Sequence, residues 1–277
     1  MRGDTMNSSG VDRLFVGSVP QLYDRYMVPL IFEPYAADLV SRVALRRPSR
    51  VLEIAAGTGV VTRQLANVLP PSVSIVATDL NQPMLDQAAA TGTSRPVEWR
   101  QADAMDLPLA DEDFDVVVCQ FGAMFVPDKA KAFSEARRVL RPGGCFLFNV
   151  WDRIDQNEFA DTVTEALRAP FPDDPPCFLA RTAHGYCDPS VIAQDLACSG
   201  FDRAPEFSTL TARSRADSPQ IPAFAYCQGT PLRIEIEARD SSRLIEATEI
   251  ATEAIAGRFG SGPVDGKIQA HVVNVER

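Results

Sequence analysis

Residues 51–65, VLEIAAGTGVVTRQL, place a carboxylate directly before a turn of small residues and a helix. Glu53 lies in an apolar, β-branched run, and Gly57 and Gly59 follow before the amphipathic helix. Small residues are needed there because a side chain in the turn would fill the space where a ligand meets the backbone. A strand, a tight turn and a helix in this order present N–H groups and a carboxylate to a nucleotide-like ligand.

Two further carboxylates lie at the ends of apolar segments. Asp79 ends the segment VSIVATD, about 20 residues after the glycine turn, which is the offset at which a carboxylate reaches ribose hydroxyls. Asp103 follows the apolar part of VEWRQADA. Asp79 could instead cap the next helix, and Asp103 could be an ordinary loop carboxylate. Their positions at strand ends favour ligand binding.

The segments that must position these residues alternate between apolar strands and amphipathic helices. After the first strand and its helix, the pattern predicts strands at 73–79, 97–104, 114–125 and 145–152, with a helix over 129–144. It then predicts a helix from Asp188–Pro189 to Gly200, a strand at 206–214, a helix at 241–260 and a last strand at 267–275. This alternation indicates an α/β fold with a doubly wound sheet and a ligand at the carboxyl ends of the strands.

With these motifs in this order, the chain resembles class I S-adenosylmethionine-dependent methyltransferases over about residues 20–210. The similarity is to the small-molecule, ubiquinone/menaquinone-biosynthesis-like branch (methyltransferase type 11). The family's acidic, glycine-rich first motif corresponds to Glu53, Ala55, Gly57 and Gly59, and Ala55 stands where the family has its first glycine. The resemblance implies a Rossmann-like, seven-stranded, mostly parallel sheet with an antiparallel last strand beside the fifth, plus N-terminal helices and a lid insertion.

The resemblance also implies S-adenosyl-L-methionine as cofactor and S-adenosyl-L-homocysteine as product. The residues that we expect to contact the cofactor are Tyr23, Arg25, Glu53, Ala55, Ala56, Gly57, Thr58, Gly59, Asp79, Leu80, Met84, Ala102, Asp103, Ala104, Gln120 and Phe121. Those expected in the acceptor pocket are Tyr26, Met124, Trp151 and Tyr186. Met84, Phe121 and Met124 could equally be core residues.

A dinucleotide site is the nearest alternative to this interpretation. Its turn would read G-x-G-x-x-G, but Thr62 occupies the third glycine position. An anionic pyrophosphate would not require Glu53 beside the turn, whereas a sulfonium and an ammonium are favoured by a carboxylate. We therefore expect methyl transfer to an O, N or C nucleophile of a small molecule. The alternatives are an NAD-dependent oxidoreductase and a non-catalytic S-adenosylmethionine-binding module.

The composition indicates which classes of partner the protein is not expected to bind. The net charge of −10 and a pI of about 4.8 oppose binding to nucleic-acid phosphates or anionic membranes. The six cysteines are dispersed without C-x-x-C spacing, which indicates reduced thiols in a cytoplasmic protein and no metal site. No apolar run reaches the ~18 residues of a membrane span, and the N-terminus lacks the pattern of a secretory signal. We expect a monomer or a homodimer.

Two segments flank the predicted core. Residues 18–46 contain Pro29 and Pro34 and predict two or three short helices. The resemblance implies that these helices close over the cofactor. There, Tyr23 or Arg25 could reach the methionine carboxylate or line the acceptor pocket with Tyr26, or the three could form a solvated helix face.

Residues 153–187 predict a lid insertion, in which His184 could serve as a general base or be a structural histidine. The predicted organisation is a flexible tail (1–17) and one methyltransferase domain (18–277). The domain comprises a helical cap (18–46), a cofactor-binding core (47–152), the lid (153–187) and a C-terminal part (188–277).

Overall fold

The computed structural model describes residues 18–277, which form two compact units. The sheet unit comprises residues 31–152, 186–212 and 269–277, and the helical unit comprises 18–30, 153–185 and 213–268. The predicted tail at 1–17 lies outside the described residues. The single-domain organisation with a lid at 153–187 stays a prediction.

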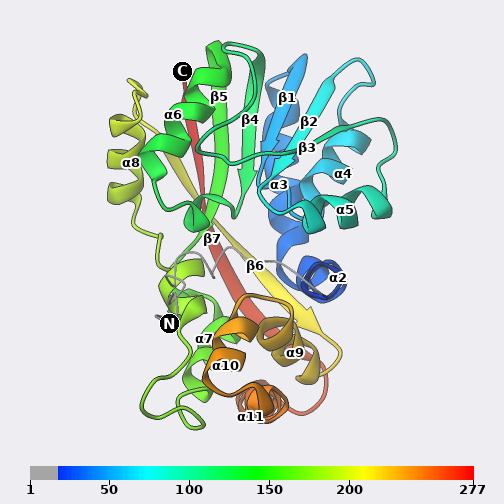
Figure 1. Cartoon of the computed structure of the whole chain (residues 1–277), viewed down its shortest axis with the longest axis vertical. Coiled ribbons are helices and arrows are strands. Elements are labelled where there is room, and N and C mark those ends of the chain that lie inside the picture. Colours follow the sequence, from blue (N-terminus) through cyan, green and yellow to red (C-terminus); the bar gives the residue numbers. More distant parts are fainter. Residues whose placement is uncertain (1–17) are drawn as a thin grey trace, which may run out of the picture. The chain divides into compact units, whose positions relative to one another are not determined.

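A seven-stranded sheet with the order β3-β2-β1-β4-β5-β7-β6 organises the sheet unit (Figure 1). Its strands are β1 (Arg50–Ile54), β2 (Ser74–Asp79), β3 (Glu98–Gln101), β4 (Phe114–Gln120), β5 (Leu140–Trp151), β6 (Glu206–Ala216) and β7 (Val264–Glu276). β1 to β5 pair in parallel, while β7 runs antiparallel beside β5 with Leu147 opposite Asn274. The predicted mostly parallel sheet with an antiparallel last strand is therefore confirmed.

One face of the sheet packs against α3 (Glu33–Leu45) and α4 (Val60–Val68). Side chains two apart on a strand point to the same face, so Val116, Val118 and Leu147 enter this core together with Leu39 and Leu65. α5 (Gln82–Thr91) packs against β2 and β3.

The opposite face is covered by α6 (Lys129–Val139), which packs on β5 and on α8 (Pro189–Cys198). Phe133 of α6 contacts Phe146 and Phe148 of β5 at ring-centroid distances of 5.6 and 5.3 Å. α8 begins as predicted, because the side chain of Asp188 accepts a hydrogen bond from the Ser190 N–H and proline occupies the first turn.

The helix predicted over 129–144 and the strand predicted over 114–125 both end earlier than expected. The helix predicted over 129–144 ends at Val139, and β5 begins at Leu140, which pairs with Phe114 across a bulge. Gly143 adopts φ +78° in this stretch, so the glycines bend a strand instead of closing a helix. β4 ends at Gln120, and the 3₁₀ turn η2 (Ala123–Phe125) takes up part of the predicted strand.

The N-terminal segment is one continuous helical run. It consists of α2 (Val19–Leu22), the π-helix η1 (Tyr23–Phe32) and α3. Pro34 lies in the first turn of α3, where its missing N–H has no helical partner to lose. Pro29 lies inside η1, whose wider turns accommodate a proline. The predicted separation into distinct helices by proline kinks is thus replaced by a change of helix type.

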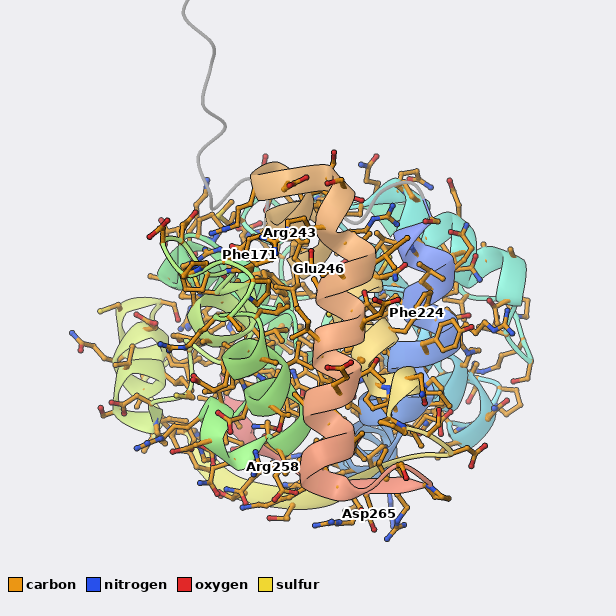
Figure 2. All side chains as sticks on the ribbon, turned by 90° about the horizontal axis from the view of Figure 1, so that it is seen from below. Phe171, Phe224, Arg243, Glu246, Arg258 and Asp265 are labelled. Atoms are coloured by element: carbon orange, nitrogen blue, oxygen red, sulfur yellow. The ribbon has the colours of Figure 1, made fainter. Side chains whose placement is uncertain are left out.

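The helical unit contains α7 (Glu158–Ala166), α9 (Gln220–Gln228), α10 (Leu232–Asp240) and α11 (Leu244–Phe259). Its short turns are η3 (Ile154–Gln156), η4 (Leu179–Ala183) and η5 (Ser241–Arg243). α11 packs against α7 and α9. In Figure 2, Arg243 and Glu246 lie near the beginning of α11 and Arg258 near its end, where Arg258 pairs with Asp161 at 3.3 Å. No helix within residues 18–277 has the length and apolar character needed to cross a bilayer.

Candidate active site

The glycine turn joins β1 to α4 at the carboxyl edge of the sheet. Gly57 and Gly59 adopt φ values of +57° and +83°, and Gly59 is the N-cap of α4. A Cβ on Gly59 would lie 3.0 Å from the ring of Trp99 and 3.1 Å from the Cβ of Ala88. Glycine is therefore required at 59 for both conformation and space. Ala55 adopts φ +55°, a strained value for alanine, at the position where the family has its first glycine.

Glu53 lies beneath this turn and is 1% exposed. It accepts a hydrogen bond of 2.5 Å from the Thr62 hydroxyl, which explains why the third glycine position of a dinucleotide motif carries threonine here. Burial, and secondarily the charge of Asp79, raise the pKa of Glu53 to about 8, although the Thr62 bond acts in the opposite direction. Sequence reasoning found Glu53 but assigned Thr62 no role.

Asp79 ends β2 and connects the turn to the neighbouring strand. Its Oδ2 accepts from the Gly57 N–H and its Oδ1 from the Asn81 N–H, both at 2.8 Å. Burial raises the pKa of Asp79, against the lowering effect of these bonds. Asn81, not Asp79, is the N-cap of α5, so the capping alternative is wrong. Two backbone bonds hold the carboxylate at the strand end, where its remaining lone pairs can accept from ribose hydroxyls.

The segment after β3 forms the next part of the same edge. The Ala102 N–H donates to the Asp79 carbonyl at 3.0 Å, and Asp103 Oδ1 accepts from the Met105 N–H at 2.9 Å. Arg138 of α6 fixes the following residues through the carbonyl oxygens of Leu107 and Leu109, at 2.9 and 2.8 Å. One carboxylate oxygen of Asp103 is therefore engaged within its own turn, and its contact with the cofactor stays a prediction. Ala104 lies in the same half-buried turn.

Further residues predicted to contact the cofactor lie around the turn. The Ala56 N–H donates to the Thr78 carbonyl at 2.9 Å, and the Thr58 side chain is buried with its hydroxyl unpartnered. Met84 is buried, and its methyl group would lie 3.6 Å from a Cβ on Gly57. Leu80 is 39% exposed beyond β2. The turn is thus lined on one side by Met84.

Phe121 follows β4 in a strained backbone conformation, φ +49°. Its N–H donates to the Oδ1 of the fully buried Asn149 at 2.9 Å. Its ring stacks on Trp151 at 3.8 Å between centroids and meets the edge of Tyr35 at 5.2 Å. These contacts bring together Phe121, predicted to contact the cofactor, and Trp151, predicted to lie in the acceptor pocket. Asn149, which holds the strained backbone, was missed because an isolated asparagine in an apolar strand gives no motif.

The loop after Phe121 is bound to α6. Lys129 Nζ donates to the carbonyl oxygens of Met124, at 3.1 Å, and of Val126. The same ammonium lies 4.8 Å from the ring centroid of Tyr186, whose hydroxyl donates to Asp195 at 2.7 Å. Burial lowers the pKa of Lys129 to about 8, with Asp195 acting in the opposite direction. Met124 and Tyr186 are therefore linked through a lysine that sequence reasoning did not single out.

The remaining predicted residues lie in the helical unit. Tyr23, Arg25 and Tyr26 are in η1, where the guanidinium of Arg25 lies 5.2 Å from the Tyr26 ring centroid. Tyr26 packs edge-on against Phe224 of α9 at 5.1 Å. His184 is buried, with Nδ1 at 3.4 Å from Asn157 Nδ2. The roles of Tyr23, Arg25 and Tyr26 at the site, and of His184 as a base, stay predictions.

Within the described part of the chain, no cluster of three or more His, Cys, Asp or Glu side chains could hold a metal ion. All six cysteines are free thiols.

The sequence of the sheet unit is similar to known methyltransferases. Residues 52–148 match the family model described as a methyltransferase domain. A ubiquinone/menaquinone biosynthesis C-methyltransferase of Pseudomonas savastanoi pv. phaseolicola is 36% identical over 138 residues, 48% of this chain and 49% of that protein. The protein of the same name from Pseudomonas aeruginosa LESB58 is 36% identical over 148 residues, covering 52% and 53%. The chain spans about half the length of these curated relatives.

Solved structures share the fold at lower identity. A protein of Bacillus halodurans C-125 superimposes with a TM-score of 0.57 and 21% identity, covering 87% of this chain and 97% of that one. An N-methyltransferase of Haemonchus contortus, solved with phosphomonomethylethanolamine and S-adenosylhomocysteine, gives a TM-score of 0.55 and 16% identity, covering 99% and 59%. Together with the glycine turn, the strand-end carboxylates and the sheet order, these findings show that residues 52–148 are similar to a methyltransferase domain and that the chain has a Rossmann-like fold.

Proposed function

We propose that the protein is an S-adenosylmethionine-dependent methyltransferase acting on a small molecule in the cytoplasm. The observation that carries the proposal is the bond from the Gly57 N–H to Asp79, which joins the glycine turn to a strand-end carboxylate above the buried Glu53. Carboxylates and turn N–H groups at this edge match the ribose hydroxyls and the cationic end of the cofactor. The curated relatives, named as C-methyltransferases, support the same chemistry.

The reaction places few chemical demands on the protein. The cofactor supplies a methyl group on a positively charged sulfur, which is already an activated leaving group. The chain's own residues therefore have to align the acceptor and exclude water. Phe121, held by Asn149 and Trp151 at the exit of β4, is a rigid surface suited to that alignment. The acceptor nucleophile is O, N or C of a small molecule, and the protein acts as a monomer or homodimer.

Calorimetric titration tests the proposal. We expect S-adenosylmethionine and S-adenosylhomocysteine to bind in the micromolar range, about −8 kcal/mol, and NAD not to bind. Asp79→Asn should lower the affinity for S-adenosylhomocysteine by about tenfold, because a ribose hydroxyl loses a charged hydrogen-bond acceptor. Asp86→Asn is the matched control, since Asp86 is exposed on α5 and hydrogen-bonded only to the Gln82 side chain in the contacts described. Equal affinities for Asp79→Asn and Asp86→Asn would contradict the assignment.

A further inference from the structure

A hollow of about 330 Å³ lies beside the C-terminal turn of α3, within the sheet unit. Arg42, Leu45 and Arg46 line it, and their spacing of three and four residues places them on one face of the helix end. This turn precedes β1, whereas the glycine turn follows β1. The five residues of β1 span about 13 Å, so the hollow at the amino edge of the sheet is separate from the cofactor site proposed at the carboxyl edge.

The strand side of the hollow consists of residues that share one face of the sheet. Asn274 of β7 is directly opposite Leu147 of β5, and its Nδ2 donates to Glu206 Oε2 of β6 at 2.9 Å. Ser208 follows two residues after Glu206 on the same strand, so its side chain points to the same face. All four residues line the hollow, and Leu147 belongs to the core that the sheet forms with α3.

Two of these side chains carry a buried polar atom that has no hydrogen-bond partner within residues 18–277. They are Ser208 Oγ and Asn274 Oδ1. A buried polar atom without a partner is costly and therefore requires an explanation. The bond from Asn274 Nδ2 to Glu206 fixes the orientation of the amide, so Oδ1 stays available as an acceptor. A ligand with several donor hydrogens would satisfy both atoms.

The charged groups around the hollow have both signs. Of five N–H groups in each guanidinium, Arg42 uses two to bond Asp38 and Arg46 uses one to bond Glu276 in the contacts described. Both side chains therefore keep donors for an anionic group. Glu206 bonds Asn274 through Oε2 alone in these contacts, so its other oxygen can accept from a cationic group.

We infer that this hollow binds a free apolar α-amino acid. The three donors of its ammonium match Asn274 Oδ1, Ser208 Oγ and the Glu206 carboxylate. Its carboxylate matches the two guanidinium groups, whose forked donors fit a carboxylate. Its apolar side chain would cover Leu45, which is 82% exposed. A volume of about 330 Å³ is at the lower end for small-molecule sites and fits a ligand of this size.

The experiment compares three ligands of the full chain by ligand-observed NMR titration. L-Phenylalanine is the probe, and we expect it to bind with a Kd of about 0.1–1 mM. 3-Phenylpropionate lacks only the ammonium and phenethylamine lacks only the carboxylate, so each should bind about tenfold more weakly. Excess S-adenosylhomocysteine should not displace L-phenylalanine, because the two sites lie at opposite edges of the sheet.

Two variants assign the ends of the ligand. Asn274→Leu should lower the affinity for L-phenylalanine by about tenfold and leave that for 3-phenylpropionate within about twofold, since the latter has no ammonium. Arg46→Met should also lower the affinity for L-phenylalanine by about tenfold but leave that for phenethylamine within about twofold. Arg47→Met is the matched control, because Arg47 is exposed beside Arg46 and is not among the lining residues. It should bind all three ligands as the wild type does.

The inference is independent of the proposed function. A protein that binds S-adenosylhomocysteine but not L-phenylalanine at millimolar concentration would refute the inference and leave the proposed function intact. Displacement of L-phenylalanine by S-adenosylhomocysteine would also overturn it, since the amino acid would then occupy the cofactor site. Equal losses for all three ligands in both variants would show that the two residues do not recognise the ends of the ligand. If Asn274→Leu fails to fold, Arg46→Met and its phenethylamine comparison decide the outcome.

Discussion

Glu53 and Asp79 are buried carboxyl groups beside the glycine turn, and burial raises the pKa of both. Desolvation raises the pKa of Glu53 to about 8, so without a ligand its carboxyl group is mostly protonated at pH 7. A cation bound nearby favours the ionised form. Binding of the cationic cofactor is therefore coupled to release of this proton.

Glu53→Gln should make the unliganded protein more stable. Between pH 4.5 and 8 the native state holds more protons than the unfolded chain, so the wild-type free energy of unfolding falls as pH rises through this window. Glutamine at position 53 does not titrate, so the free energy of unfolding of the variant does not fall in this way. Its amide oxygen can still accept a hydrogen bond from Thr62. We expect its advantage to grow by about 3–5 kcal/mol between pH 4.5 and 8, measured by urea unfolding at several pH values.

The same variant separates stability from binding. Because only S-adenosylmethionine carries the sulfonium charge, Glu53→Gln should weaken the binding of S-adenosylmethionine more than the binding of S-adenosylhomocysteine. Thr62→Val provides the comparison: it keeps the carboxyl group of Glu53 but removes the hydroxyl group that donates a hydrogen bond to it. A stability difference between Glu53→Gln and wild type that stays constant with pH would contradict the assigned pKa shift.

At the scale of elements, the glycine turn and the exit of β4 are sterically coupled. A Cβ on Gly122 would lie 2.4 Å from the Cβ of Ala55 and 2.7 Å from the Sγ of Cys119. Gly122 has an ordinary φ of −94°, so its constraint is space alone. The alanine that replaces the family's first glycine thus fills the space in front of Gly122 and makes glycine necessary there.

This coupling can be measured with a double-mutant cycle. Gly122→Ala should destabilise the protein by about 1–3 kcal/mol through overpacking. Ala55→Gly removes the nearest obstacle, so the double variant should recover about 1 kcal/mol of that loss. Unfolding free energies of the four proteins give the coupling. Gly257→Ala in α11, where a Cβ meets nothing within 4 Å, is the control and should not destabilise. Additive changes would contradict the contact.

Lys129 links α6 to the loop after β4, and the burial of its ammonium group disfavours the charged form. Its pKa is lowered to about 8 from 10.5, so the native state holds fewer protons than the unfolded chain between these pH values. The wild-type free energy of unfolding should therefore rise relative to Lys129→Met by about 2–3 kcal/mol from pH 8 to 10.5. Lys131→Met, at an exposed position of the same helix, should show no such trend in the same unfolding series.

The sequence predicted elements better than contacts. The alternation of strands and helices was enough to predict a doubly wound α/β sheet, because burial fixes the period of each segment. The seven strands and the antiparallel last strand followed from the family resemblance. Thr62, Asn149 and Lys129 escaped because their roles depend on partners 9, 28 and 5 residues away, respectively, that only the folded chain brings into contact. The early start of β5 was missed because proline and glycines usually end an element, whereas here they form a bulge.

At the scale of the whole molecule, the predicted site residues divide between the two units. Glu53, Asp79, Asp103, Gln120 and Phe121 belong to the sheet unit, whereas Tyr23, Arg25, Tyr26 and His184 belong to the helical unit. The chain passes between the units after Asp152 and again after Gly185, close to the limits predicted for the lid.

We therefore expect S-adenosylhomocysteine to slow amide exchange at 18–35 and 153–187 as well as at the glycine turn. Lids are drawn from the less stable parts of a fold, so their exchange responds most to ligand. Hydrogen-exchange mass spectrometry with saturating ligand measures the effect, and peptides from α8 provide the internal control. Asp79→Asn should bind the ligand more weakly, so the same ligand concentration no longer saturates the protein. The protection in both segments should then fall in proportion to the fraction of protein with bound ligand. Protection confined to residues 51–60 would show that the helical unit does not respond to the cofactor, and the predicted lid would then be wrong.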